Sequence, residues 1–222
     1  MAKKAETPEI RFGRLCLVTP HDLDADRFAP ELDVALRSGL VATLILDLGG
    51  LDGDAALLAA ERLVPLAQAN DVAAIVADDV ELALRVQADG VQVGTGHADL
   101  RRALGRLHPD RIVGAAGLRT RHEAMVAGEN ECDYLFFGRL DGDTGAHIFD
   151  KALDLAAWWS AVFEIPAVVM GGNTVASVVE AVDAGIEFVA LRDAVWRHEA
   201  GVAAALSEAN ALALARQGLT VP

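Results

Sequence analysis

The stretch that decides the fold is Pro-Ala-Val-Val-Met-Gly-Gly-Asn-Thr, residues 166–174. Four apolar residues in a row, without alternation, are typical of a strand that is buried on both faces. The glycine pair then removes every side chain where the chain turns, and Asn173 or Thr174 is expected to cap a following helix. Such a turn brings backbone amides and the positive end of a helix toward a ligand, which favours phosphate. A tight turn without a ligand is the alternative at this point.

The rest of the chain repeats the pattern of an apolar run followed by a helical segment. We predict eight strands, at residues 14–20, 42–48, 73–78, 90–94, 111–117, 134–140, 167–172 and 188–193. Helical patterns follow them, at about residues 24–38, 54–69, 80–87, 99–107, 120–129, 150–162, 174–184 and 196–217. Eight such units without a break in composition predict an α/β protein with the (β/α)₈ TIM barrel fold, and an open doubly wound sheet is the alternative. We expect a flexible segment at residues 1–10 and a single barrel domain at residues 11–222.

The composition narrows the classes of partner. The chain of 222 residues is 53% hydrophobic but only 5% aromatic, so its core must be built from small aliphatic side chains. A formal net charge of −14 argues against nucleic acid or an anionic membrane surface as a partner. Because neither a signal peptide nor a membrane-spanning segment is recognisable, we expect a cytoplasmic protein. A homo-oligomer is left open.

Several common site types are absent from the sequence. No Gly-x-Gly-x-x-Gly follows the first strand, and no Gly-x-Ser-x-Gly is present, which disfavours dinucleotide binding and hydrolase chemistry. The histidines form no closely spaced pair of the kind that binds transition metals. Cys16 and Cys132 lack metal-binding spacing, and we interpret both as buried thiols.

In a TIM barrel the active site lies at the carboxyl ends of the strands, where this chain carries many polar residues. The candidates are Thr19, His21, Asp47, Asp78, Asp79, Thr95, His97, Asp99, Arg119, Arg139, Asp141, Asp143, Asn173, Arg192 and Asp193. Asp78 ends an apolar run at a strand tip, so its carboxylate either points over the barrel mouth or caps the next helix. Carboxylate oxygens suit Mg²⁺, which takes one or two of them together with substrate phosphates.

A succession of segments resembles the thiamine phosphate synthase family, within the superfamily that also holds the thiazole tautomerases. The segments that carry the resemblance lie at residues 15–19, 77–84, 88–94, 111–114, 132–138, 168–173 and 188–191. They follow one another at matching strands over nearly the whole barrel. Their order is more specific than any one of them.

The resemblance implies an enzyme that joins hydroxymethylpyrimidine diphosphate to a thiazole phosphate and releases pyrophosphate with the help of Mg²⁺. It places the metal on Asp78 and, across a slightly longer loop, on Asp99. It also implies that a small phosphorylated substrate binds to backbone amides of Gly171 and Gly172, with Asn173 and Arg192 beside them. Arg139 and Lys151 are then the candidates to face the diphosphate.

The sequence departs from this family at the residues that bind the diphosphate. A Gln-x-Arg-x-Lys cluster ends the second strand in the family, whereas this chain has Leu-Ile-Leu-Asp-Leu at residues 44–48. The asparagine expected before Asp78 is Ala77, and the Thr-rich loop with its lysine after the sixth strand is also lost. At the eighth strand Asp193 stands where the family has serine, and only Arg192 offsets its charge.

Three functional hypotheses follow from the sequence. The leading one is a thiamine phosphate synthase-like enzyme. The second is a catalytically silent relative that binds a phosphorylated ligand in a regulatory or scaffolding role. The third, suggested by the acidic barrel mouth, is a barrel enzyme with an uncharged or cationic substrate.

Overall fold

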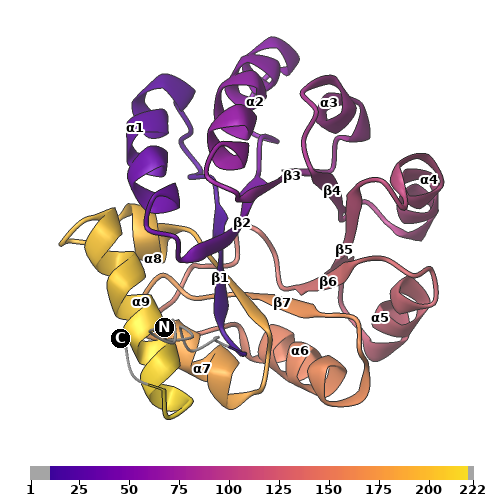
Figure 1. The fold of residues 1–222 in the computed structure, drawn as a ribbon. Coiled ribbons are helices and arrows are strands. Elements are labelled where there is room, and N and C mark those ends of the chain that lie inside the picture. Colours follow the sequence, from indigo (N-terminus) through magenta and orange to yellow (C-terminus); the bar gives the residue numbers. More distant parts are fainter. Residues whose placement is uncertain (1–10, 220–222) are drawn as a thin grey trace, which may run out of the picture.

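A computed structural model describes residues 11–219, and its strands close one parallel barrel in the order β1 to β8 (Figure 1). The strands are β1 (Arg14–Val18), β2 (Val41–Leu46), β3 (Ala73–Ala77), β4 (Gly90–Val93), β5 (Ile112–Leu118), β6 (Tyr134–Phe137), β7 (Ala167–Met170) and β8 (Phe188–Leu191). The barrel closes where β1 pairs in parallel with β8. This confirms the predicted (β/α)₈ TIM barrel and excludes the open sheet. The predicted flexible segment, residues 1–10, lies outside the described residues.

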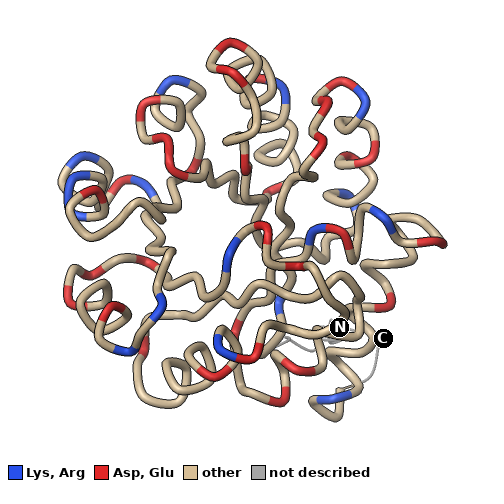
Figure 2. The backbone as a smooth tube through the Cα atoms, turned by 180° about the vertical axis from the view of Figure 1, so that it is seen from behind, with Lys and Arg blue, Asp and Glu red and all other residues tan. Residues whose placement is uncertain are grey.

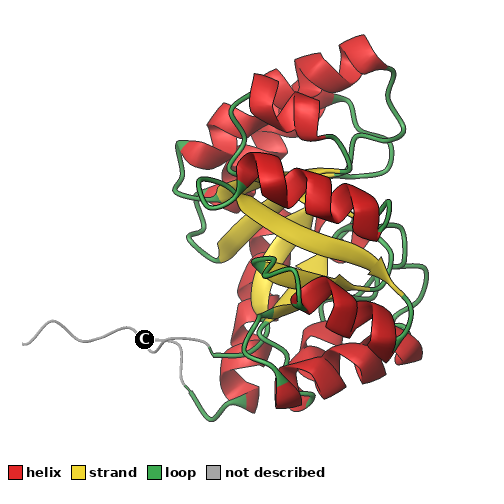
Figure 3. Ribbon diagram, turned by 90° about the vertical axis from the view of Figure 1, so that its right-hand side faces the viewer, coloured by secondary structure: helices red, strands yellow, loops and turns green. Residues whose placement is uncertain are grey.

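Helices surround the barrel and cover the outer face of every strand (Figures 1 and 3). They are α1 (Ala25–Leu36), α2 (Gly53–Gln68), α3 (Val80–Arg85), α4 (His97–Leu107), α5 (Arg121–Gly128), α6 (Asp150–Val162), α7 (Ser177–Asp183), α8 (Asp193–Trp196) and α9 (Val202–Arg216). The charged residues lie mainly on these outer helices and in the loops (Figure 2). No helix of the described part has the length and apolar character needed to span a membrane.

Two predicted helices differ from the structure at their starts. The helix expected at residues 196–217 begins only at Val202, as α9, after Gly201 with a φ of +82°, and the short helix α8 lies before it at Asp193–Trp196, next to the end of the predicted eighth strand. The helix expected from residue 174 begins at Ser177, and its N-cap is Ala176 without a side-chain hydrogen bond. The prediction that Asn173 or Thr174 caps this helix is therefore wrong. Ser177 is fully buried, and its hydroxyl donates to the Thr174 carbonyl oxygen at 2.8 Å.

The barrel interior is a separate small core inside the ring of strands. Its buried members include Cys16 and Val18 on β1, Phe136 on β6 and Met170 on β7. These side chains alternate along each strand with residues that pack outward against the helices. Burial raises the pKa of the Cys16 thiol to about 12. Cys16 and Cys132 are both free and buried, as the sequence predicts.

Acidic residues at the start of alternate strands tie neighbouring strands together at the bottom of the barrel. Asp89, before β4, accepts a hydrogen bond from the Ala74 amide of β3 at 2.8 Å. Asp133, before β6, accepts one from the Val113 amide of β5 at 2.7 Å. Glu187 does the same for β7. Three of the acidic side chains of this chain therefore help to set strand register.

A substitution at Gly114 can test how tightly the barrel interior is packed. It pairs with Tyr134, and a Cβ at this position would overlap the tyrosine ring. We expect Gly114→Ala to lower the free energy of unfolding by about 1 to 3 kcal/mol, because the added methyl group overpacks the barrel. Gly105→Ala is the matched control, since its Cβ meets nothing within 4 Å on helix α4 and alanine favours a helix. Equal urea midpoints for the two variants would contradict this packing.

Candidate functional site

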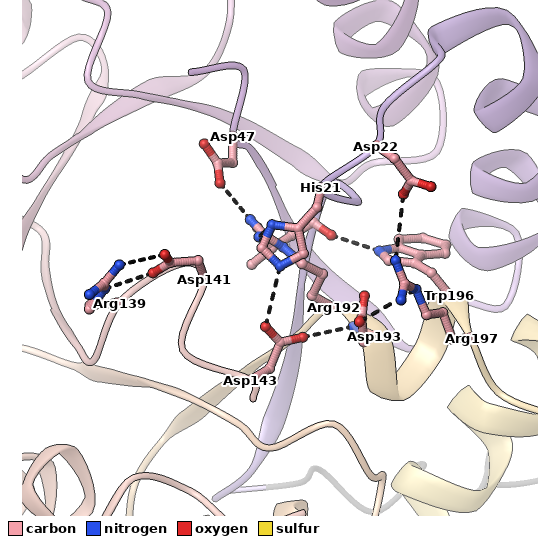
Figure 4. A network of polar contacts seen from close by, with 11 residues as sticks. His21, Asp22, Asp47, Arg139, Asp141, Asp143, Arg192, Asp193, Trp196 and Arg197 are labelled. Carbon is pink, nitrogen blue, oxygen red and sulfur yellow. Dashed lines mark hydrogen bonds and ion pairs between the residues drawn. The ribbon is translucent and has the colours of Figure 1, made fainter. Parts of the chain in front are cut away.

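Arg192 is a fully buried cation at the carboxyl end of β8, in the mouth of the barrel (Figure 4). Its Nη2 donates to Oδ2 of Asp47 at 2.6 Å. Its Nη1 lies 2.7 Å from Nδ1 and 2.9 Å from Nε2 of His21. A guanidinium can only donate, so Arg192 is the donor in its contact with Asp47. The Nε atom of Arg192 is buried without a hydrogen-bond partner among the described residues.

Asp47 is held in place by the end of the neighbouring strand. The buried Thr19 hydroxyl accepts a hydrogen bond from the Asp47 amide at 2.9 Å and donates one to the Asp47 carbonyl oxygen at 3.1 Å. This double contact fixes the backbone just beyond β1 and β2. The Asp47 side chain is then directed at Arg192, from a strand that lies two places away around the ring. The acidic end of β2 therefore neutralises the cation of β8.

Asp143 is a second carboxylate in the barrel mouth, with a side chain only 2% exposed. Its Oδ2 accepts a hydrogen bond from the Asp193 amide at 3.0 Å, and its Oδ1 lies 3.7 Å from Nε2 of His21. Helix α8 is attached to β1 because Trp196 donates from Nε1 to the Val18 carbonyl oxygen at 2.7 Å. Asp193, the first residue of α8, is therefore held next to Asp143 by its amide. Asp143 and Asp193 lie near His21 and Arg192, whereas Asp47 is the carboxylate that binds the guanidinium (Figure 4).

Asp78 and Asp99, the predicted metal ligands, line one cavity of about 360 Å³ beyond β3 and β4. Asp78 has a φ of +58°, and its Oδ1 accepts a hydrogen bond from the Gly94 amide at 2.5 Å. Asp79, its neighbour, is the N-cap of α3, so Asp78 is not a helix cap. Asp99 lies in the first turn of α4, and its Oδ1 is 3.1 Å from Nη1 of Arg102.

The chemistry of these groups fits a hard cation. The cavity is lined by four acidic residues, Asp78, Asp79, Glu81 and Asp99, and by Arg102 and Arg106, which pair with Asp99 and Glu81. Carboxylate oxygens suit Mg²⁺ when phosphate oxygens complete its shell. Within residues 11–219 no group of three or more His, Cys, Asp and Glu side chains is arranged to hold a metal ion. A cation at this place therefore depends on ligands from a substrate.

Arg139 and Lys151 line a second cavity, of about 600 Å³, beyond β5, β6 and β7. Arg119 is a third cation in its wall. Arg139 donates from Nε to Oδ1 of Asp141 at 2.7 Å, and its Nη2 contacts the other carboxylate oxygen. The hydrogen bond from Arg139 keeps the pKa of the Asp141 carboxyl below its usual value, and the charge of Arg192 acts in the same direction.

The glycine turn after β7 is closed by the chain itself. The Gly171 amide donates to the Ala190 carbonyl oxygen at 2.8 Å, and the Gly172 amide to the Ser177 hydroxyl at 3.1 Å. The Asn173 amide donates to the Gly145 carbonyl oxygen at 2.8 Å. A Cβ on Gly172 would overlap the Ala146 carbonyl oxygen. In this conformation the backbone that approaches these glycines belongs to the β6–α6 loop, and the three amides already have acceptors.

The β6–α6 loop is held in this position by α7. Glu180 accepts a hydrogen bond from the Ile148 amide at 3.1 Å, and its other oxygen lies 2.8 Å from Nδ1 of His147. The Thr174 hydroxyl donates to the Ala146 carbonyl oxygen at 3.0 Å. The loop must therefore lift away before a ligand can reach the glycine turn.

The sequence of this chain matches a known protein family. The sequence model described as thiamine monophosphate synthase matches residues 15–195. The chain belongs to the thiamine monophosphate synthase family. It is 42% identical over 199 residues to the thiamine-phosphate synthase of Rhodospirillum centenum, which covers 89% of this chain and 96% of that protein. The thiamine-phosphate synthase of Hyphomonas neptunium is 36% identical over 205 residues, covering 90% and 93% of the two chains.

A solved structure has the same fold. The thiamine phosphate pyrophosphorylase of Pyrococcus furiosus superposes with a TM-score of 0.75 and 24% sequence identity, and the match covers 91% of this chain and 96% of the other. This likeness concerns the fold. The sequence matches confirm the resemblance drawn from the strand segments.

Sequence reasoning named Asp47 and Arg192 separately but missed that they form a pair. The two residues are 145 positions apart in the chain, and no local pattern joins them. The sequence does show that each residue is the first charged residue after an apolar strand. In the closed barrel these two strands flank β1. The sequence offers Arg119, with Arg139 and Lys151, as a replacement for the lost cations, and the β5–α5 loop places it in the same cavity as Lys151.

The pair of Asp47 and Arg192 can be tested by stability. We expect Asp47→Asn to lower the free energy of unfolding by about 2 to 4 kcal/mol, because it leaves a buried guanidinium without its counter-charge. Asp33→Asn is the control: its partner Arg37 lies 2.8 Å away on the exposed face of α1, where an ion pair contributes less than about 1 kcal/mol. Urea unfolding measures both. Losses of equal size would show that Arg192 does not depend on Asp47.

Proposed function

We propose that this chain is an enzyme that couples hydroxymethylpyrimidine diphosphate to thiazole phosphate and releases pyrophosphate, a step of thiamine biosynthesis. The observation that carries the proposal is the 42% identity to a thiamine-phosphate synthase over 89% of the chain. The relatives are named as synthases, which favours an active enzyme over the catalytically inactive, phosphate-binding alternative. The substrates are then small phosphorylated molecules, and we place the reaction in the cytoplasm.

Asp78 and Asp99 are the residues that would hold Mg²⁺. A bound Mg²⁺ supplies positive charge to the diphosphate that leaves. The carboxylate of Asp78 is fixed by the Gly94 amide and by its own left-handed backbone, so one of its oxygens has a defined position at the cavity. Asp99 is less constrained because it also pairs with Arg102. The pair provides one rigid and one adjustable carboxylate.

The remaining predicted residues act on the anionic groups of the substrates. Arg139 and Lys151, in the larger cavity, stabilise the negative charge that develops as the bond between the pyrimidine methylene carbon and the diphosphate oxygen breaks. The Asn173 amide binds the thiazole phosphate once the β6–α6 loop has lifted, and Gly171 and Gly172 leave room for the phosphate beside it, while their amides stay bonded to Ala190 and Ser177. Arg192 contributes positive charge from beneath this site, which Asp47 partly cancels.

The assignment of Asp78 has a close control in the adjacent residue. We expect Asp78→Asn to lower kcat at least about 100-fold, because a neutral amide is a poor ligand for Mg²⁺ and asparagine tolerates the same backbone conformation. Asp79→Asn should keep wild-type turnover, since asparagine caps α3 as well as aspartate does. The assay follows thiamine phosphate formation from the two substrates with Mg²⁺. Absence of product from the wild-type protein would refute the proposed function, and equal rates of the two variants would refute the assignment.

The proposed phosphate site at the glycine turn requires the loop to move. Glu180→Ala removes the two carboxylate oxygens that contact His147 and Ile148 of the loop and leaves the contacts of Asn173 and Thr174, so we expect a lower KM for thiazole phosphate by about threefold or more with little change in kcat. Glu164→Ala, on the segment between α6 and β7, changes the charge equally without touching the loop. A raised or unchanged KM for Glu180→Ala would contradict the requirement for opening.

A further inference from the structure

The cavity that Asp78 and Asp99 line lies between two neighbouring outer helices, α3 and α4 (Figure 1). Its volume is about 360 Å³, so packed side chains do not fill the space between the two helices here. One wall is the start of α3, with Asp78 before the helix and Glu81 in its first turn. The other wall is one side of α4. Contacts across the cavity therefore decide how the two walls are placed relative to each other.

Three charged residues of α4 form its wall of the cavity. Asp99, Arg102 and Arg106 all line the cavity, and their spacing places them on one side of the helix. The buried apolar residues of α4 pack against the barrel instead. Apolar packing thus holds α4 on the barrel, and the charged side is what it presents to α3.

Arg106 reaches across the cavity to α3. Its Nη1 and Nη2 contact the two carboxylate oxygens of Glu81, with Nη2 and Oε2 3.3 Å apart. Such a two-pronged contact fixes the orientation of both side chains. The hydrogen bond from Arg106 lowers the pKa of the Glu81 carboxyl below its usual value. No other hydrogen bond or ion pair joins α3 to α4 in the part of the chain that the structure describes.

The bridge between Glu81 and Arg106 acts on the predicted metal ligands because each of its ends shares an element with one of them. Glu81 follows Asp78 by less than one helical turn, and Arg106 lies two turns after Asp99 on the same side of α4. The Asp78 carboxylate is already held by the Gly94 amide at 2.5 Å. Asp99 is carried by α4, so its distance from Asp78 follows the position of that helix.

Arg102 acts differently, although it lies between Asp99 and Arg106 on α4. Its Nη1 is 3.1 Å from Oδ1 of Asp99, and 71% of its side chain is exposed. A metal ion that binds Asp99 competes with this exposed pair, which is weak. Arg106 is not such a competitor, because Glu81 holds its guanidinium.

We propose that Arg106 is a positioning residue for the metal: by binding Glu81 it fixes α4 relative to α3, so that the Asp78 and Asp99 carboxylates keep one spacing. Neither Arg106 nor Glu81 contacts the metal ion. This inference rests on the proposed function for the metal and for the diphosphate that completes its shell. Removal of a positive charge beside the site should then weaken metal binding, the reverse of what charge repulsion alone would give.

The experiment measures binding of inorganic pyrophosphate by isothermal titration calorimetry, once in Mg²⁺ and once in EDTA. The ratio of the two dissociation constants is the gain in affinity that the metal confers. We expect Arg106→Gln to reduce this gain about threefold to fivefold, the effect of losing one exposed ion pair. Arg102→Gln removes a competitor for Asp99 and should not reduce the gain. Arg101→Gln, exposed on α4 but outside the cavity, is the charge-matched control and should keep the wild-type gain.

A double variant tests whether Arg106 acts through Glu81. Glu81→Arg together with Arg106→Glu reverses the bridge and should restore most of the gain, whereas a direct effect of the Arg106 charge on the ligand would not be restored. Circular dichroism and the urea midpoint verify that each variant is folded.

Three results would overturn the inference: an unchanged gain in Arg106→Gln, a loss of equal size in Arg101→Gln or Arg102→Gln, or a reversed pair that stays at the level of Arg106→Gln. Wild-type protein that gains nothing from Mg²⁺ would overturn it together with the metal assignment. Turnover is assayed separately. A gain that depends on Arg106 in a protein that forms no thiamine phosphate would keep the inference and refute the proposed function.

Discussion

The closure of the sheet between β1 and β8 is the constraint on which the site depends. Because these strands pair along residues 14–17 and 188–191, the end of β8 lies beside the end of β1, and β1 alone separates β8 from β2. Only this closure brings Arg192 within 2.6 Å of Asp47. A buried guanidinium is tolerated where a carboxylate lies in reach, so strand closure and charge pairing require each other.

The fold could be predicted from the sequence because burial on both faces leaves a strong local pattern. All eight strands exist where unbroken apolar runs predict them, and α6 has the expected bounds, residues 150–162. The failures lie where tertiary contacts override the pattern. The last helix is broken at residues 197–201 although the sequence on both sides favours helix, because α8 is attached to β1 through Trp196.

The candidate site was predictable in its residue types but not in its partners. The run that ends at Asp78 and Asp79 offers two carboxylates, and only the structure shows that Asp79 caps α3 while Asp78 turns toward Gly94. The glycine pair at residues 171–172 predicts a turn where the backbone approaches a ligand, and in the structure the chain's own β6–α6 loop lies against it. Ala146 is the group that approaches.

The positions of the cations show how so acidic a chain can still bind an anion. Arg192 and Arg139 are each paired with a carboxylate, so an anion that uses either must displace Asp47 or Asp141. Displacement from Asp47 is costly because Arg192 is completely buried and Thr19 holds the aspartate. Separating Arg139 from Asp141 costs little free energy, because this ion pair is exposed to water. Arg119 and Lys151 form no ion pair within residues 11–219 that an anion would have to break. Under the proposed function, the diphosphate is then bound first in the cavity beyond β5 and β6, and the buried pair of Asp47 and Arg192 holds the ends of β2 and β8 together.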